Sequence, residues 1–127
     1  MFIFANPNPV KQLVGDCVIR GISIVKDQTW IQTYNDISRK GREMYDMPSS
    51  NAVWNAYLMD SGYRKIGISN TCPNCYTVKD FCIDHPFGVY LVATGTHVVA
   101  VIDGNYYDTW DSGDEVPLYY YEREDYR

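Results

Sequence analysis

The sequence has little positive charge and no long hydrophobic run. Lys and Arg number 11 against 16 Asp and Glu, which gives a net charge of −5. A protein whose main partner is nucleic acid needs a basic face to displace counterions from the phosphates, so this balance excludes nucleic acid as the main partner. The longest purely apolar run, Val98–Ile102, is far shorter than a membrane-spanning helix requires, so we expect no membrane partner either.

Targeting signals and repeats are also missing. The first residues carry no basic segment, and their apolar run is too short for a signal peptide, so we expect a cytoplasmic protein whose thiols stay reduced. No internal repeat or low-complexity tract interrupts the sequence. The 127 residues are 46% hydrophobic and 21% charged, which predicts one folded domain over residues 1–127.

Apolar residues follow helical spacing in the first part of the chain and alternate in the last part. The predicted helices begin near residues 17, 30, 50 and 78, and the second and third are expected to end at Gly41 and Gly62. The predicted strands cover residues 89–94, 98–102, 105–110 and 116–121. Helices followed by a meander indicate the α+β class, with N-terminal helices packed on one side of a C-terminal antiparallel sheet.

Cys17 lies at the start of the first predicted helix, where Asp16 is the expected N-cap. A thiol there feels the positive end of the helix dipole and the free backbone N–H groups, and both favour the nucleophilic thiolate. The backbone N–H of Cys17 could also stabilise an oxyanion. The alternative is a small buried hydrophobic side chain, the usual role of a free cysteine.

A predicted hairpin brings His97 close to acidic and aromatic residues. Asp103-Gly104 is a typical two-residue hairpin turn. With this turn, His97, Asp108 and Trp110 share one face of the hairpin. Asp111 falls on the other face unless the strand bulges or ends first. The alternative is a structural histidine at the edge of a sheet.

Three segments together resemble the papain-like cysteine peptidases. Gly15-Asp16-Cys17 resembles the family's cysteine motif at the start of its central helix, Thr96-His97-Val-Val-Ala-Val resembles its histidine strand, and Asp108-Thr-Trp110 resembles its Asn-Ser-Trp with Asp replacing Asn. The same segments resemble small uncharacterised phage and bacterial proteins of this superfamily. The resemblance implies a papain-like fold and a thiol hydrolase, a peptidase or amidase, that acts on a peptide or protein in the cytoplasm of a bacterium or a phage-infected host.

The resemblance also implies a role for each matching residue. Cys17 is the nucleophile, His97 is the base that activates it, and Asp108 orients the imidazole, with Asp111 in reserve for that role. Trp110 is expected to cover the contact between His97 and its acid. The reaction is acyl transfer through a thioester, which requires no cofactor and no metal.

One departure from the family pattern concerns the oxyanion hole. Papain-like enzymes place a glutamine six residues before the cysteine, whereas this chain has Lys11 there and Gln12 one residue later. Gln12 is therefore the candidate donor, and loss of such a donor typically costs about 2.7–4 kcal/mol of transition-state stabilisation. An alternative function follows from this departure: a catalytically idle papain-like fold that serves as a phage or bacterial binding module.

The other three thiols form a local cluster with a histidine. Cys72, Cys75, Cys82 and His85 have the spacing C-x2-C-x6-C-x2-H, which could supply four ligands to a zinc ion that stabilises an interaction domain. Two alternatives stay open, namely a reversible disulfide between Cys72 and Cys75, and thiols without a special role.

Overall fold

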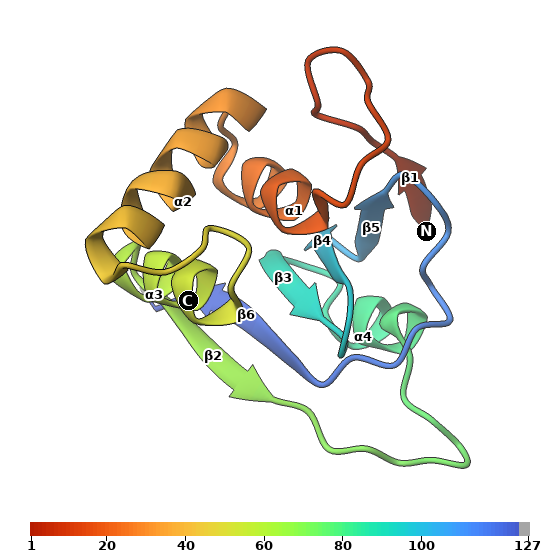
Figure 1. Ribbon diagram of the computed structural model, residues 1–127. Helices are drawn as coiled ribbons and strands as arrows, with labels where there is room; N and C mark the ends of the chain where they lie inside the picture. Colours follow the sequence, from red (N-terminus) through yellow and green to blue (C-terminus); the bar gives the residue numbers. More distant parts are fainter. Residues whose placement is uncertain (125–127) are drawn as a thin grey trace.

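The fold combines four helices with one six-stranded sheet (Figure 1). The computed structural model describes residues 1–124. The helices are α1 (Cys17–Lys26), α2 (Trp30–Met44), α3 (Asn51–Asp60) and α4 (Val78–Asp84). The strands are β1 (Phe2–Phe4), β2 (Tyr63–Gly67), β3 (Val89–Ala93), β4 (Val98–Ile102), β5 (Asn105–Asp108) and β6 (Tyr119–Arg123). Their order in the sheet is β1-β5-β4-β3-β6-β2. The α+β class is confirmed.

The sheet is mixed, so the expectation of an antiparallel sheet is wrong at one edge. β1 pairs with β5 in parallel, with Phe4 opposite Asp108, whereas the pairs among β2 to β6 are antiparallel. β1 has only three residues and is followed by a segment that contains prolines. So short a strand shows no alternating pattern by which the sequence could predict it. Its partner strand ends at Asp108, so β1 supports a residue of the candidate site.

The predicted register of the central hairpin is confirmed. Asp103 and Gly104 have φ angles of 49° and 77°, as a two-residue turn with both central residues left-handed requires. This turn pairs Ile102 with Asn105 and continues in register along β4 and β5. Because the two strands are antiparallel, the start of β4 and the end of β5 lie at the same end of the sheet.

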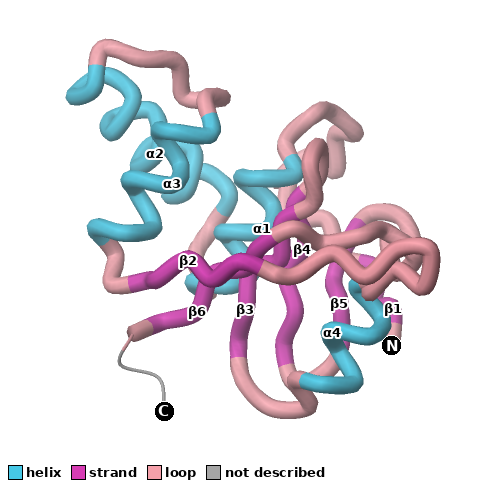
Figure 2. Tube along the Cα trace, turned by 90° about the horizontal axis from the view of Figure 1, so that it is seen from below, coloured by secondary structure: helices cyan, strands magenta, loops and turns pink. Residues whose placement is uncertain are grey.

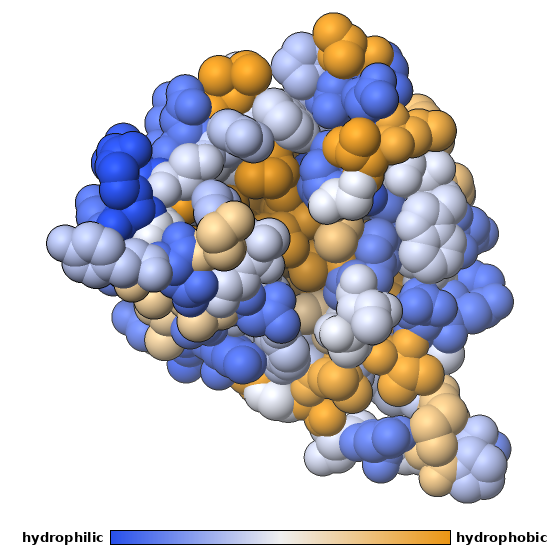
Figure 3. All heavy atoms as spheres, viewed as in Figure 1, coloured by the Kyte–Doolittle hydropathy of each residue, from blue (hydrophilic) through white to orange (hydrophobic). Residues whose placement is uncertain are grey.

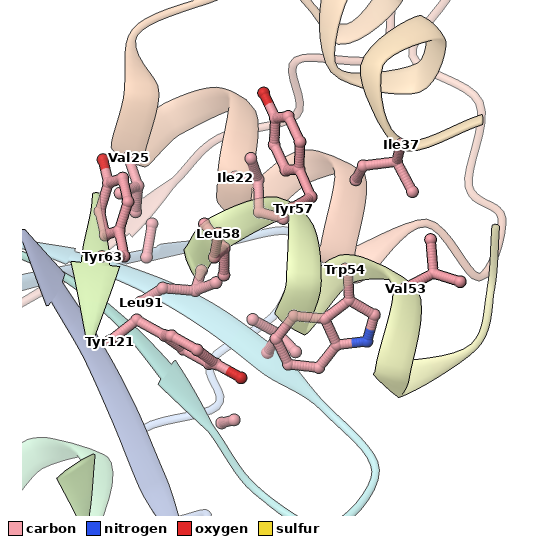
Figure 4. Packing of buried hydrophobic residues seen from close by; sticks show 13 residues of the cluster. Ile22, Val25, Ile37, Val53, Trp54, Tyr57, Leu58, Tyr63, Leu91 and Tyr121 are labelled. Atoms are coloured by element: carbon pink, nitrogen blue, oxygen red, sulfur yellow. The ribbon is translucent and has the colours of Figure 1, made fainter. Parts of the chain in front are cut away.

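Both faces of the sheet carry a buried core, so the expectation that helices cover one side is wrong. Figure 4 shows Leu91 and Tyr121 of the sheet facing Ile22 and Leu58, which belong to the core under α1 and α3. The alternate strand residues pack instead against α4, whose Phe81 anchors a second core. Its buried members are Val78, Phe81, Cys82, Val92, Val99, Val101 and Tyr106. α4 lies apart from α2 and α3, which pack side by side (Figures 1 and 2). Strands as apolar as β3 and β4 need cover on both faces.

The helix ends follow the sequence signals in part. α1 begins at Cys17 as predicted, and Thr77 forms the expected capping box with Asp80 at α4. α2 continues past Gly41 to Met44, so Gly41 does not end the helix as predicted. Gly41 instead permits close packing, since a Cβ there would lie 2.9 Å from the backbone oxygen of Asp46 in the returning chain. Within residues 1–124, no helix has both the length and the apolar character that a membrane crossing needs.

Candidate functional site

Cys17, His97 and Asp108 meet at one end of the sheet. Cys17 is the first residue of α1, His97 directly precedes β4, and Asp108 is the last residue of β5. α1 packs on β4, which brings the thiol to the strand ends. Cys17 and His97 line a cleft of about 380 Å³, together with Trp110 and two threonines. The three residues singled out from distant parts of the sequence therefore form one site.

The contact between His97 and Asp108 is direct and buried. Nε2 of His97 lies 2.6 Å from Oδ2 of Asp108, and Asp108 is only 3% exposed. Ser112 donates its hydroxyl to the same oxygen at 2.7 Å, and the backbone N–H of Thr109 donates to Oδ1 at 2.8 Å. Burial alone would raise the pKa of Asp108, but the hydrogen bonds from His97 and Ser112 outweigh it and lower that pKa. Asp108 is therefore a carboxylate that can hold a positive imidazolium.

The thiol and the imidazole stabilise each other's charged forms. Burial would raise the pKa of Cys17, but the hydrogen bond with His97 and the charge of that residue lower it below its ordinary value. Burial would lower the pKa of His97, but the hydrogen bonds with Asp108 and Cys17 raise it to about 9. Because Asp108 engages Nε2, Nδ1 is the nitrogen left for the thiol. The arrangement favours a thiolate–imidazolium pair.

Trp110 lies over the imidazole on the cleft side. The centroids of the His97 and Trp110 rings are 4.9 Å apart, with an angle of 40° between the ring planes. Trp110 is partly open to solvent and also lines the cleft. Its position agrees with the role of covering the contact between His97 and Asp108 that the family resemblance implies.

The reserve acid does not take part in this cluster. Asp111 accepts hydrogen bonds from the Tyr106 hydroxyl and from the backbone N–H of Gly113. It lines a cavity of about 580 Å³, which lies beside α4 and includes none of the three clustered residues. Between the two acids that the sequence offered, the structure places only Asp108 at His97.

Gln12 is not placed as an oxyanion donor. It is exposed, and the residues that line the cleft begin with Leu13. The loop before α1 is shaped by Asn8, whose buried side-chain oxygen accepts from the backbone N–H groups of Val10 and Gln12. This folds the loop so that Gln12 lies outside the cleft, a turn that the residue spacing alone does not reveal.

Sequence reasoning missed a buried ion network beneath the site. Arg20, only 7% exposed, donates to Asp16 and lies 3.5 Å from Oδ1 of Asp108. The second oxygen of Asp16 accepts from the indole N–H of Trp30 at 2.8 Å. Asp16 therefore does not cap α1 with its side chain, contrary to prediction. The four-residue spacing of Asp16 and Arg20 on one helix face was the available signal.

The proposed zinc ligands are not brought together. Cys72 and Cys75 form a disulfide, which was one of the open alternatives. Cys82, a residue of α4, is buried in the second core, and His85 stacks on Phe81 with its Nδ1 2.9 Å from the backbone oxygen of Phe81. In the described part of the chain no group of three His, Cys, Asp or Glu residues could hold a metal ion. Because Cys82 and His85 pack in and beside α4, they lie away from the disulfide of Cys72 and Cys75, which the spacing of these residues in the sequence did not show.

Comparisons with known proteins found no match, so the function is inferred from this geometry and from the sequence. The chain matches no protein family model, no curated protein and no solved structure.

Proposed function

We propose that this chain is a thiol hydrolase, a peptidase or amidase of papain-like type, that acts through a thioester on Cys17. One observation carries the proposal: the His97 imidazole contacts the Asp108 carboxylate at 2.6 Å and lines the same cleft as the Cys17 thiol, whose pKa it lowers. Such a chain of groups activates a nucleophile and returns a proton to the leaving group. The likeness of three segments to the papain-like family supports the same conclusion.

Each chemical step uses the thiolate–imidazolium pair. The Cys17 thiolate attacks the carbonyl carbon of a bound amide, so a carbon–sulfur bond forms and the carbonyl oxygen becomes negative. The His97 imidazolium then donates its proton to the leaving nitrogen as the carbon–nitrogen bond breaks, which leaves a thioester and a neutral amine. Neutral His97 next takes a proton from water, whose oxygen attacks the thioester. The carbon–sulfur bond breaks, the acid is released and the pair is restored.

The start of α1 supplies donors for the developing oxyanion. The first N–H groups of a helix have no partner within the helix, and the earliest such bond of α1 runs from Arg20 to the carbonyl oxygen of Asp16. The backbone N–H of Cys17 is therefore available beside the sulfur. In this proposal it takes the role that Gln12, outside the cleft, does not fill.

A second candidate function is binding without turnover in the same cleft. The exposed position of Gln12 favours it, because a weak oxyanion hole slows turnover but leaves the cleft intact. The two candidate functions differ in whether an acyl group on Cys17 is hydrolysed, as turnover requires.

Alkylation and ester hydrolysis test the proposal together. Iodoacetamide at pH 7 is expected to label Cys17 at least tenfold faster than Cys82, which is buried and whose thiol pKa is raised by burial. A p-nitrophenyl ester is then expected to release many equivalents of nitrophenol per protein, and none above background in Cys17→Ala. Equal labelling of the two thiols contradicts the nucleophile. Release that stops at one equivalent favours the binding module.

A further inference from the structure

A second cavity adjoins the cleft on the side of α2. It has a volume of about 280 Å³ and shares Val14 and Gly15 with the cleft that holds Cys17. We call it the side pocket; its main walls are Val14, Ile19, Trp30, Tyr34, Ser38 and Pro48. Its volume falls just below the range of about 300–1,000 Å³ typical of sites for whole small molecules, so it suits a single large side chain.

The walls of the side pocket are mostly apolar and aromatic, and its polar lining residues are Asp16, Ser38 and Ser49. The rings of Trp30 and Tyr34 stack with centroids 5.2 Å apart. The indole N–H of Trp30 is already donated to Asp16, so the ring offers only carbon surface to the pocket. Asp16 itself is paired with Arg20, and neither charge is free for a ligand. An apolar occupant therefore fits these walls better than a charged one.

Gly15 lies between the side pocket and the cleft. A Cβ at this position would meet no atom within 4 Å, and the backbone of Gly15 is not left-handed. Neither packing nor conformation requires glycine here. The missing side chain leaves open space where a ligand could pass close to the backbone, from the sulfur of Cys17 to the side pocket.

The loop on one side of the cleft also carries exposed apolar side chains. Leu13 and Val14 are exposed and line the cleft, and Val10 is exposed in the same loop. Figure 3 shows apolar side chains gathered over this loop, which precedes α1. Exposed apolar groups beside a concave site typically mark a surface that binds a partner. The rim and the side pocket therefore favour the same kind of ligand.

We infer that the side pocket binds a bulky apolar side chain of a peptide substrate, on the acyl side of the bond that Cys17 attacks. This inference rests on the proposed function and names its substrate class. The acyl residue would lie along Gly15, with its side chain between Trp30 and Tyr34 and its carbonyl carbon at the sulfur. The side pocket is expected to select apolar over charged side chains. An apolar side chain gains free energy when it leaves water for an apolar pocket, whereas a charged side chain would lose its hydration and find no partner.

A series of N-acetyl amino-acid p-nitrophenyl esters tests this inference. The leaving group stays constant, and the acyl residue is Phe, Leu, Gly, Asp or Lys. The Phe and Leu esters are expected to acylate Cys17 about tenfold or more faster than the Gly ester, with Asp and Lys no faster than Gly. Tyr34→Ala, which removes one wall, and Ser38→Phe, which fills the pocket, are each expected to lower the Phe to Gly ratio severalfold.

Tyr45→Ala is the matched control, because Tyr45 is 97% exposed and lies outside both cavities. It should keep the ratio of the unchanged protein, and circular dichroism shows that each variant is folded. Equal rates for the Phe, Gly and Lys esters, or a ratio that survives both pocket variants, would overturn the inference. If iodoacetamide still labels Cys17 selectively in that case, the proposed function stands without this specificity. Failure of both reagents to react at Cys17 overturns the proposed function itself.

Discussion

Replacing His97 with glutamine is expected to cause the largest loss of reactivity. Without the imidazolium, the pKa of Cys17 returns toward its ordinary value, so only a few per cent of the thiol is ionised at pH 7. Burial then raises the pKa further. We expect alkylation of Cys17 by iodoacetamide at pH 7 to slow about tenfold or more. Ester hydrolysis should fall about 10²–10⁴-fold, because the proton donor for the leaving group is lost as well.

The only other histidine supplies the control. His85 stacks on Phe81 with ring centroids 3.8 Å apart and belongs to the packing around α4. His85→Gln should therefore leave alkylation of Cys17 unchanged, even where it lowers the melting temperature. Equal losses of Cys17 reactivity in the two variants would mean that His97 acts only through the fold. An unchanged rate in His97→Gln would remove the imidazole from the mechanism.

Replacing Arg20 with methionine is expected to cause the largest loss of stability. Arg20 is the cation between the buried carboxylates of Asp16 and Asp108, so its removal leaves Asp16 without a cationic partner and leaves Asp108 with His97 alone. Breaking a buried pair in this way typically costs about 3–5 kcal/mol. The free energy of unfolding in urea measures the loss. The pKa of Cys17 should rise as well, because the charge of Arg20 contributes to its lowering.

Arg39→Met is the matched control on the neighbouring helix. The Arg39 side chain is 56% exposed and lies 3.1 Å from Asp36. An ion pair open to solvent contributes about 1 kcal/mol or less, so this variant should remain close to the unchanged protein in stability. The pH dependence of Cys17 alkylation should not shift. A loss in Arg20→Met no greater than in Arg39→Met would show that the buried network neither stabilises the fold nor tunes the site.

Local signals in the sequence predicted the parts of the site that depend on local geometry. The Asp103-Gly104 turn fixes the pairing of β4 with β5, and from that pairing His97 and Asp108 fall within reach of each other. The helix begins at Cys17 as predicted, although the expected side-chain cap by Asp16 is not formed. These features are decided within one hairpin or one helical turn.

Features that depend on distant contacts could not be predicted in the same way. The parallel edge strand β1 gains its partner from the other end of the chain, and α4 covers the face of the sheet that the expected fold left open. Arg20 joins its helix neighbour Asp16 to Asp108, which lies 88 residues after Arg20 in the sequence, so only half of this network has a local signal. Asn8 holds the backbone of Gln12 in a loop that leaves Gln12 out of the cleft lining, which the spacing to Cys17 does not encode.

The pKa of His97 distinguishes a thiolate–imidazolium pair from a neutral thiol beside a neutral imidazole. Nuclear magnetic resonance resolves two imidazole titrations, one for each histidine, and Cys17→Ala gives the reference state without the thiolate. We expect His97 to stay protonated through neutral pH and to lose its proton with a pKa of about 9 as the pH rises. In Cys17→Ala that pKa should fall, since the hydrogen bond and charge of Cys17 help to raise it. A pKa near the ordinary value of about 6.5, unchanged by Cys17→Ala, would contradict the thiolate–imidazolium pair.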